Sequence, residues 1–394
     1  MTLLPWLGVL VSVMLGIRVV LWLCYRPTGR VDAASLPTLT VVIPAFNEGR
    51  GVLRAIESVL ASDYPAEKLH VIAVNDGSTD DTGVYIDEAI ARFPTRFTGL
   101  HQPTNLGKRE AVFRGFRQAT SEIIATVDSD SMVPPESLAN LVSPLVIDPA
   151  VSGVAGKVLV LNRGENLLTR MLGVRYILGF DFIRAYQSVL RTVWCCPGAL
   201  QAYRRETVAP HFERWARQTF LGARCTNGDD HAMTNMVLSL GQDTVYQSTA
   251  EVLTLVPTTY RQLTRMYTRW GRSATREGLR ALVFTPRRVV SMRWWRGPLV
   301  ALDAVLQPLT ILARVVGFGA ALVLLVTDPL WLAKAALATT VIAVGYGLIY
   351  LRSERSREVI FAVLYGWYAL LLLPWVQPWA TLTVRGNKWL TRGS

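Results

Sequence analysis

The sequence has few cysteines and no repetitive segments, and each of these scarcities excludes a class of protein. The four cysteines, Cys24, Cys195, Cys196 and Cys225, show neither the spacing of a metal site nor a disulfide framework. The adjacent Cys195 and Cys196 cannot easily pair with each other, so we expect reduced thiols that face the cytosol. The 394 residues also contain no internal repeat and no low-complexity linker, which argues against a repeat array.

Acidic residues are scarce as well: 29 stand against 41 basic residues, which gives a net charge of +12. Such an excess could indicate nucleic-acid binding, but many of the basic residues flank long apolar runs. These flanking residues are Arg26, Arg30, Arg287, Arg288, Arg293 and Arg296. Their placement is typical of the cytoplasmic rim of a membrane protein, and 51% of all residues are hydrophobic. We therefore expect membrane lipid as a partner and no nucleic acid.

Long apolar runs are abundant. The run from Leu3 to Leu23 is long enough to span a bilayer, and it predicts an N-terminal anchor within residues 1–30. A cleaved signal peptide is the alternative, because small residues occur at 33–35, but the positive charges follow the run instead of preceding it. Three further runs, at about 299–326, 330–351 and 359–384, predict a C-terminal transmembrane channel segment over residues 299–394.

The C-terminal runs contain features that leave their arrangement open. Asp303, Gln307 and Arg314 are unfavourable in lipid, so they should face an aqueous path or pair within the helix bundle. Four single spans would place the basic tail at 385–388 outside, against the positive-inside tendency. Pro374 and Pro378 could divide the last run into two short passes, which would return the tail to the cytoplasm.

Residues 258–298 have a different character from both neighbouring segments. Between 260 and 282, arginines and aromatic residues recur at helical spacing, and residues 291–296 contain two tryptophans between arginines. Both stretches are typical of amphipathic helices that lie at a membrane interface.

Residues 37–257 alternate between two kinds of apolar pattern. Short β-branched runs at 39–43, 69–74 and 123–127 predict strands, and helical spacing occurs at 51–60, 82–93 and 107–119. This alternation predicts an α/β domain with a Rossmann-like open sheet, in which ligands bind beyond the carboxyl ends of the strands. Polar clusters follow the three strands at 44–48, 75–80 and 128–131, as expected for a nucleotide site.

Asp128 and Asp130 directly follow the strand that ends at Val127. Two carboxylates one residue apart can converge on a divalent cation and a ribose, and hard oxygen ligands suit Mg²⁺ or Mn²⁺. The alternative is a polar turn in which Asp130 or Ser131 caps the next helix.

Two further residues fit a nucleotide. Asp76 could accept a hydrogen bond from a uracil N–H or a ribose hydroxyl, with an ordinary Asx turn as the alternative. Lys108 opens a helix just after Gly107, and a lysine at a helix start can bind a diphosphate, although it could also be a solvated helix end.

Two later sites fit sugar transfer. Asp230, in the sequence Gly228-Asp-Asp-His231, is the candidate general base, because a hydroxyl acceptor must lose a proton as the nucleotide leaves. Asp229 could instead simply cap the next helix. Arg269 can pair with a diphosphate and Trp270 can stack on a sugar ring of the acceptor, although an interfacial anchoring pair is the alternative.

Taken together, these residues resemble the inverting, processive membrane glycosyltransferases of family 2, which have the GT-A fold. The likeness is greatest to hyaluronan synthases, then to rhizobial chitooligosaccharide synthases, and more distant to cellulose synthases. It covers about residues 38–275 and, more loosely, the C-terminal membrane part. The stretches that carry it are 127–131, Gly107-Lys-Arg109, 196–206, 218–222, Gly228-Asp-Asp230, 245–250 and Arg269-Trp270.

The resemblance implies a role for each site residue. Asp76 and Asp128 would hold the uridine, Asp130 the metal, and Lys108 the nucleotide. Asp230 would be the base, Arg269 and Trp270 would close over the diphosphate and acceptor, and Cys196 would lie near the acceptor terminus. Three positions depart from the family pattern: Met266 replaces a glutamine, His231 an arginine and Pro197 a serine. The sequence also does not show the second N-terminal span of the family pattern.

The sequence therefore predicts an integral plasma (inner) membrane enzyme with a cytoplasmic catalytic domain. It would use a UDP-sugar and Mg²⁺ or Mn²⁺ to extend a β-linked polysaccharide and would export the product. The resemblance favours hyaluronan, made from UDP-GlcNAc and UDP-GlcA. Alternatives are a chitooligosaccharide-type synthase that needs only UDP-GlcNAc, a non-processive transferase to a lipid carrier, and a transport protein with a degenerate nucleotide-sensing domain. The sequence does not determine the oligomeric state.

Overall fold

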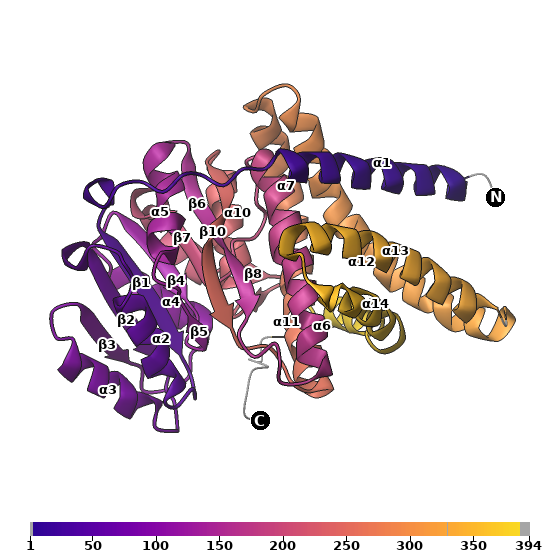
Figure 1. Ribbon diagram of the computed structural model, residues 1–394. Coiled ribbons are helices and arrows are strands. Elements are labelled where there is room, and N and C mark those ends of the chain that lie inside the picture. The colour runs from indigo at the N-terminus through magenta and orange to yellow at the C-terminus, as the bar shows by residue number, and fades with distance from the viewer. Residues whose placement is uncertain (1–2, 329, 387–394) are drawn as a thin grey trace.

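The computed structural model describes residues 3–328 and 330–386, with side chains from Ser12 onward. An α/β domain built on a large sheet lies at one side, and long helices project from the other (Figure 1). The sheet has eight strands in the order β3-β2-β1-β4-β7-β6-β10-β5. The strands are β1 (Leu39–Ala45), β2 (Leu69–Asn75), β3 (Phe97–His101), β4 (Ile123–Val127), β5 (Ser131–Met132), β6 (Val151–Val160), β7 (Leu200–Arg204) and β10 (Asp243–Thr254). A separate small hairpin consists of β8 (Thr219–Phe220) and β9 (Ala223–Arg224).

The two halves of the sheet differ in strand direction. Strands β1 to β4 run parallel, as the alternation of strands and helices predicts. Strand β7 then runs antiparallel to both β4 and β6, and β5 pairs antiparallel with β10. The sequence analysis did not identify β5, β6, β7 or β10. As a result, the parallel strands β1, β2 and β4 and the antiparallel strands of the second half form one sheet, joined where β4 pairs with β7.

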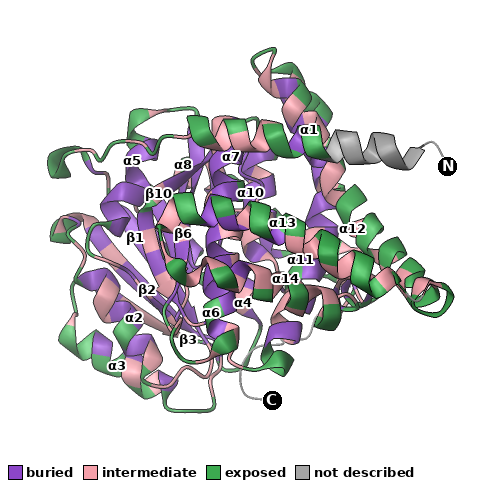
Figure 2. Cartoon of the chain, turned by 45° about the vertical axis from the view of Figure 1, so that its right-hand side comes forward, coloured by how far each residue is buried: buried purple, intermediate pink, exposed green. Residues whose placement is uncertain are grey.

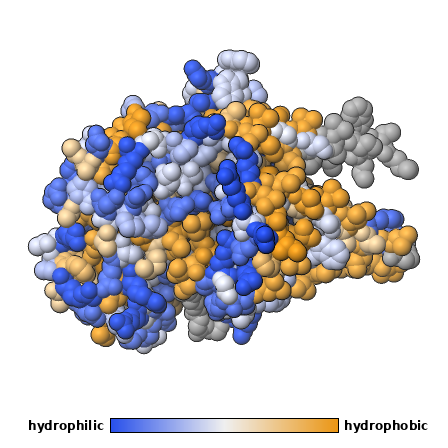
Figure 3. All heavy atoms as spheres, viewed as in Figure 1, coloured by the Kyte–Doolittle hydropathy of each residue, from blue (hydrophilic) through white to orange (hydrophobic). Residues whose placement is uncertain are grey.

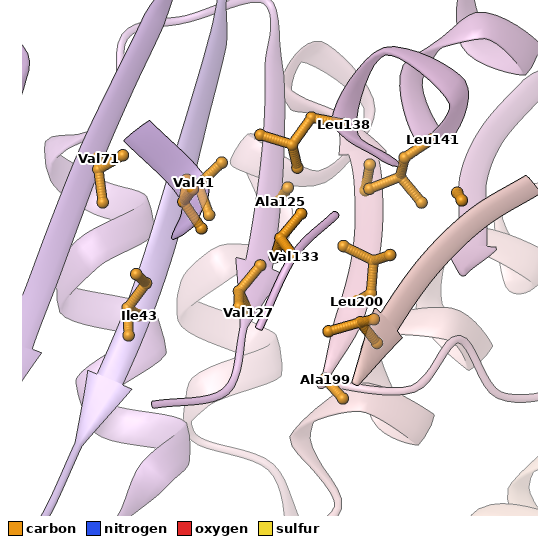
Figure 4. Close-up of a cluster of buried hydrophobic side chains, with 14 of the residues drawn as sticks. Val41, Ile43, Val71, Ala125, Val127, Val133, Leu138, Leu141, Ala199 and Leu200 are labelled. Carbon is orange, nitrogen blue, oxygen red and sulfur yellow. The ribbon is translucent and has the colours of Figure 1, made fainter. Parts of the chain in front are cut away.

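Each face of the sheet is covered by helices. Alternate residues of β1 point to opposite sides: Val41 and Ile43 join one buried cluster, whereas Val42 joins the other. Figure 4 shows part of the first cluster, where Val41 and Val127 lie on the same side as Leu138 of α5. The helices of this half are α2 (Gly51–Leu60), α3 (Thr82–Arg92), α4 (Lys108–Gln118) and α5 (Ser137–Ile147). Strands buried on both faces are typical of parallel sheets, and they make the site's scaffold rigid.

The second half adds further helices. These are α6 (Leu167–Tyr176), the π-helix Ile177–Phe182, α7 (Ile183–Val189), α8 (Arg205–Val208), α9 (Phe212–Ala216), α10 (Asp229–Ser239) and α11 (Tyr260–Val290). Helices α6 and α11 among them contact the projecting segments. Short 3₁₀ turns occur at Ala33–Ser35, Ala66–Lys68, Ala209–His211 and Arg357–Val359. Helix α11 is one continuous helix of 31 residues, longer than the predicted stretch, and residues 291–295 form a turn before α12 instead of a second helix.

The C-terminal runs form the projecting helices α12 (Arg296–Thr327), α13 (Trp331–Glu354), α14 (Ile360–Leu372) and α15 (Val376–Leu382). Helices α12 and α13 are long and apolar enough to cross a membrane, and many of their residues are exposed (Figure 2). Hydrophobic side chains gather over this side of the molecule (Figure 3). The last run bends by 53° next to Pro374, so it is a broken span or a re-entrant loop, in agreement with the predicted interruption.

The other predictions for the membrane part concern the N-terminal anchor, the basic tail and the polar residues of α12, and the described residues bear on only some of them. Helix α1 (Leu3–Cys24) follows the predicted first run, and its part from Ser12 to Cys24 is an apolar helix shorter than a full span. Residues 387–394 of the basic tail lie outside the described residues. Asp303 of α12 does face protein: it is 3% exposed and pairs with Arg18 of α1 at 2.8 Å. Arg314 of the same helix is exposed.

Candidate active site

A cavity of about 940 Å³ lies between the sheet and the projecting helices. Its walls come from the end of β4, the loop 195–198, the start of α10, the segment α6–α7 and helix α11. Six of the eight predicted site residues line it: Lys108, Asp128, Asp130, Asp230, Arg269 and Trp270. Their positions span 163 residues of sequence (270 − 108 + 1), yet the fold gathers them around one space. Asp76 and Cys196 are not among the lining residues.

The Asp128–Asp130 pair lies where β4 ends at the cavity wall. The carboxylate of Asp130 accepts hydrogen bonds from the Thr254 hydroxyl at 3.1 Å and from the Ser131 hydroxyl at 3.3 Å. Thr254 is the last residue of β10, so the antiparallel half of the sheet fixes the orientation of this carboxylate. Asp130 therefore lines the cavity from a braced position, and the N-cap of the next helix, α5, is Glu136 instead.

Lys108 connects two acidic groups of the site. Its ammonium group forms an ion pair with the Asp128 carboxylate. Burial by itself would lower the pKa of Lys108, but the carboxylates of Asp128, Asp229 and Asp230 outweigh burial and raise it. The lysine is thus positively charged at neutral pH. A diphosphate that enters the cavity could pair with this ammonium group in addition to the carboxylates.

Asp230 is held at the cavity by the first turn of α10 and by the loop 195–198. One carboxylate oxygen accepts a hydrogen bond from the backbone N–H of His231 at 2.8 Å, and the other from the N–H of Gly198 at 3.3 Å. A Cβ at Gly198 would lie 2.9 Å from Lys108 Nζ, so a side chain at this position would displace the lysine ammonium group. The glycine therefore leaves room for the Lys108 ammonium group close to Asp230.

Arg109 is a functional residue to which the sequence analysis gave no role. Its guanidinium is buried, and it donates hydrogen bonds to the backbone oxygens of Asn227 at 3.2 Å and Gly228 at 3.1 Å. It also donates to the Gln218 side chain at 2.8 Å. Gly228 has a φ of +71° and immediately precedes Asp229 and Asp230, so Arg109 fixes the turn that presents the candidate base. Its presence in the Gly107-Lys-Arg109 stretch was the only available signal.

Arg269 and Trp270 lie on α11 and close the far wall of the cavity. The Trp270 ring lies beside three other aromatic rings, with centroids 5.5 Å from Tyr267, 6.2 Å from Tyr176 and 6.4 Å from Phe180. Met266, at the position where the family pattern has glutamine, also lines the cavity and accepts a contact from the Tyr176 hydroxyl at 3.9 Å. This wall is a group of flat apolar rings with cations beside it, which suits sugar rings and phosphates.

Asp76 lies behind the cavity wall and makes no direct approach to it. The side chain is 1% exposed, and its two oxygens accept hydrogen bonds from Gln102, from the Leu106 N–H at 2.8 Å and from the Gly107 N–H at 2.9 Å. The pKa of Asp76 is raised by burial, although the two backbone donors oppose this effect. In this structure Asp76 holds the loop that leads into Lys108, and a direct contact with uridine stays a prediction.

The structure places the Cys196 side chain away from the cavity surface, and its expected position near the acceptor stays a prediction. Cys196 is 0% exposed and packs in the core with Tyr203, and burial raises the pKa of its thiol to about 12. Cys195 lines the cavity instead. Neighbouring residues of an extended segment point to opposite sides, so a shift of one position separates the buried thiol from the accessible one.

The cavity suits a divalent cation only if the ligand completes its coordination. In the described part of the chain, no three His, Cys, Asp or Glu side chains are grouped so that they could hold a metal ion alone. Asp130 offers hard carboxylate oxygens, and Lys108 and Arg269 lie in the same cavity for the phosphates. Such a donor set fits Mg²⁺ or Mn²⁺, which commonly bind through one or two carboxylates together with substrate phosphates.

Comparison with known proteins agrees with this geometry. The profile of the family described as "Glycosyltransferase like family 2" matches residues 37–273. This chain belongs to glycosyltransferase family 2. It is 32% identical to an N-acetylglucosaminyltransferase of Rhizobium meliloti (strain 1021) over 368 residues, which cover 92% of this chain and 83% of that protein. It is 30% identical to a hyaluronan synthase of Streptococcus pyogenes over 361 residues, which cover 90% of this chain and 83% of that protein.

The fold has a solved counterpart. A mannosyltransferase from Pyrobaculum calidifontis, solved in complex with GDP-Man and Mn²⁺, superposes with a TM-score of 0.62 and 20% sequence identity, covering 92% of this chain and 97% of that one. The predicted GT-A fold, with a curled open sheet, is thereby confirmed, and so is the prediction that this family 2 protein is a glycosyltransferase.

Proposed function

We propose that this glycosyltransferase takes sugars from UDP-activated donors and adds them processively to a β-linked polysaccharide, which its membrane helices export. The observation that carries the proposal is that Asp230 lines the same cavity as the Asp128–Asp130 pair and the Arg269–Trp270 pair. Donor, acceptor and base would then share one site beside the projecting helices. The similarity to a hyaluronan synthase and to an N-acetylglucosaminyltransferase supports a sugar polymer as the product.

The residues divide into a donor side and an acceptor side. On the donor side, Asp128 would bind the uridine, Lys108 and Arg269 the diphosphate, and Asp130 the cation, while Asp76 fixes the loop that precedes Lys108. Mg²⁺ or Mn²⁺, when bound, would neutralise charge that develops on the leaving diphosphate. On the acceptor side, Trp270 would stack on the terminal sugar.

Asp230 would act as the general base on the acceptor hydroxyl. The hydroxyl oxygen attacks the anomeric carbon on the face opposite the diphosphate, a glycosidic bond forms and the bond to the UDP oxygen breaks. The hydroxyl proton moves to the Asp230 carboxylate. Because attack and departure occur on opposite faces, the anomeric configuration inverts, and an α-linked donor gives a β-linked product.

The catalytic domain would face the cytoplasm, because UDP-sugars are supplied there and basic residues, which favour the cytoplasmic side, flank the apolar helices. The protein would then be an integral plasma (inner) membrane enzyme. The product is either a hyaluronan-like chain with two donors or a chitin-like chain from UDP-GlcNAc alone.

The proposal is tested by incubating the purified full-length protein with radiolabelled UDP-sugars, singly and in pairs, and sizing the products. We expect long products to form from the first minutes, with Mg²⁺ or Mn²⁺ required: EDTA should abolish incorporation and an excess of either cation should restore it. Incorporation that needs both UDP-GlcNAc and UDP-GlcA indicates a hyaluronan-like product, and UDP-GlcNAc alone indicates a chitin-like one. Transfer of a single sugar to a lipid, or no transfer at all, would refute the proposal.

A substitution of Lys108 tests the donor side separately. Lys108→Gln removes the cation that pairs with Asp128, and the loss of one charged hydrogen bond to the diphosphate should weaken UDP binding about tenfold or more. Titration calorimetry with UDP and Mn²⁺ measures the change. Arg114→Gln, an exposed arginine on the same helix, is the matched control and should bind UDP as the unmodified protein does. Equal affinity for UDP in both variants would remove Lys108 from the donor site.

A further inference from the structure

The helix that forms one wall of the cavity changes its hydrogen-bond pattern in the middle. Helix α6 continues into the π-helix Ile177–Phe182 and then into α7 without a break. A π-helical turn inserts an extra residue and often marks a functional site. Arg175 before the π-helix, Gly179 and Phe180 within it and Arg184 after it all line the cavity.

Arg184 is fixed in place by the backbone around it. It is 9% exposed, its Nε donates to the carbonyl oxygen of Cys195 at 3.0 Å, and its Nη1 donates to the carbonyl oxygen of Gly179 at 2.9 Å. Its guanidinium carbon lies 4.2 Å from the centroid of the Phe180 ring. The charge is therefore held rigidly over an aromatic ring by neutral groups alone.

Arg175 lies about two helical turns before Arg184 and is surrounded by phenols. Its hydrogen-bond partner is the hydroxyl of Tyr365 on α14, and that hydroxyl lies 2.9 Å from the hydroxyl of Tyr267. The guanidinium occupies the space above Gly179, where a Cβ would overlap it. Among the described residues, neither Arg175 nor Arg184 forms an ion pair with a carboxylate. Two half-buried or buried cations without counter-ions are unfavourable unless a ligand supplies the anion.

The two arginines follow the direction that an acceptor must take. Loop 195–198 contacts both residues: Arg184 donates to the Cys195 carbonyl, and the Gly198 N–H donates to Asp230, so Arg184 and the candidate base are held by the same loop. Arg175 lies further on, in contact with α14 of the projecting helices. A chain that extends from Asp230 toward the membrane helices would pass Arg184 first and Arg175 second.

We propose that Arg175 and Arg184 form a carboxylate-binding subsite for the acceptor, so that the growing polysaccharide contains uronic acid residues. A guanidinium binds a carboxylate through two parallel hydrogen bonds, and the Phe180 and Tyr176 rings present flat apolar surfaces to the sugar rings between the charges. A neutral chitin-like chain would leave both cations unpaired. The inference rests on the proposed function. Of the two products named there, it selects the hyaluronan-like chain, which is acidic.

The test compares two tetrasaccharides that differ only in charge. One alternates GlcNAc with glucuronic acid, and in the other the glucuronic acid carboxyls have been reduced to hydroxymethyl groups. Binding to the purified full-length protein, with UDP and Mn²⁺ present, is measured by calorimetry. We expect the acidic tetrasaccharide to bind about tenfold tighter or more, since each charged hydrogen bond contributes substantially. Arg175→Gln should remove most of this preference and leave UDP affinity unchanged.

Two further variants make the result specific. Arg170→Gln, an exposed arginine on the same helix, should retain the full preference. Gly179→Ala keeps both charges and favours helix formation, but its methyl group displaces the Arg175 guanidinium, so the preference should fall without loss of folding.

Several outcomes would overturn the subsite. These are equal binding of the two tetrasaccharides by the unmodified protein, an unchanged preference in Arg175→Gln, weakened UDP binding in that variant, or competition by a polyprenyl phosphate in place of the acidic glycan. Failure of the proposed function would look different, because incorporation of UDP-sugars would be absent while glycan binding, which needs no turnover, could still be compared.

Discussion

Asp230→Asn should lose polysaccharide synthesis by about 10²–10⁴-fold and retain UDP binding, because general-base catalysis contributes this much to rate and little to ground-state affinity. The amide is nearly the same size as the carboxylate, and its oxygen can still accept the hydrogen bond from the Gly198 N–H. It cannot take a proton from the acceptor hydroxyl at neutral pH. Initial rates of sugar incorporation and calorimetric UDP affinity, measured on the same preparation, check both parts.

The adjacent carboxylate provides the matched control. Asp229 is buried beside Asp230, and burial raises its pKa, with Lys108 acting in the opposite direction. Asp229→Asn should therefore affect the rate much less than Asp230→Asn. If the two variants were equally active, or if Asp230→Asn synthesised polymer at the normal rate, Asp230 would not be the base.

Arg109→Ala should destabilise the protein by about 3–5 kcal/mol, because it leaves buried carbonyl groups without donors and removes a cation next to buried acids. Arg109 is 2% exposed, and its guanidinium carbon lies 5.7 Å from the centroid of the Trp215 ring, so the substitution also leaves a void. We expect a fall in the unfolding temperature on the order of 10 °C, measured by thermal unfolding in detergent. The remaining folded protein should also be slow, since the Gly228 turn that presents Asp230 would no longer be fixed.

Arg117→Ala serves as the comparison for this variant. Arg117 lies on the same helix, and its side chain is 65% exposed, with one long surface ion pair to Glu213 at 3.5 Å. Exposed pairs of this kind contribute little to stability, so its unfolding temperature should stay close to that of the unmodified protein. Similar unfolding temperatures for the two variants would show that Arg109 does not hold the turn.

The parallel half of the fold could be predicted from local sequence patterns. Runs such as 39–43 and 123–127 are continuous, β-branched and bounded by polar turns, and they form β1 and β4 at nearly the predicted limits. The second half was not identified from the sequence. Strand β10 is polar at several positions, and its partners β6 and β5 come from distant parts of the chain. Strand β7 likewise pairs with the distant strands β4 and β6. Their pairing depends on tertiary contacts that no local pattern records.

Individual site residues were predictable to different degrees. Asp128 and Asp130 lie just after strand β4, and Asp230 lies in the first turn of helix α10. At these ends of elements the side chains line the cavity, so a polar residue there was a usable signal. The burial of Cys196 was not predictable, because neither of two adjacent cysteines has a pattern around it that indicates which thiol is accessible. Arg109 was missed since its partners are backbone carbonyls from 118 and 119 residues away.

The central claim is that the separated carboxylates bind one sugar nucleotide through one cation in this cavity. The most direct test is a cryo-electron microscopy structure of the full-length protein with UDP and Mn²⁺. The account predicts cation density between the Asp130 carboxylate and the diphosphate, with Asp230 facing the open side of the cavity where the acceptor binds. A nucleotide bound elsewhere, or a cation without contact to Asp130, would contradict it.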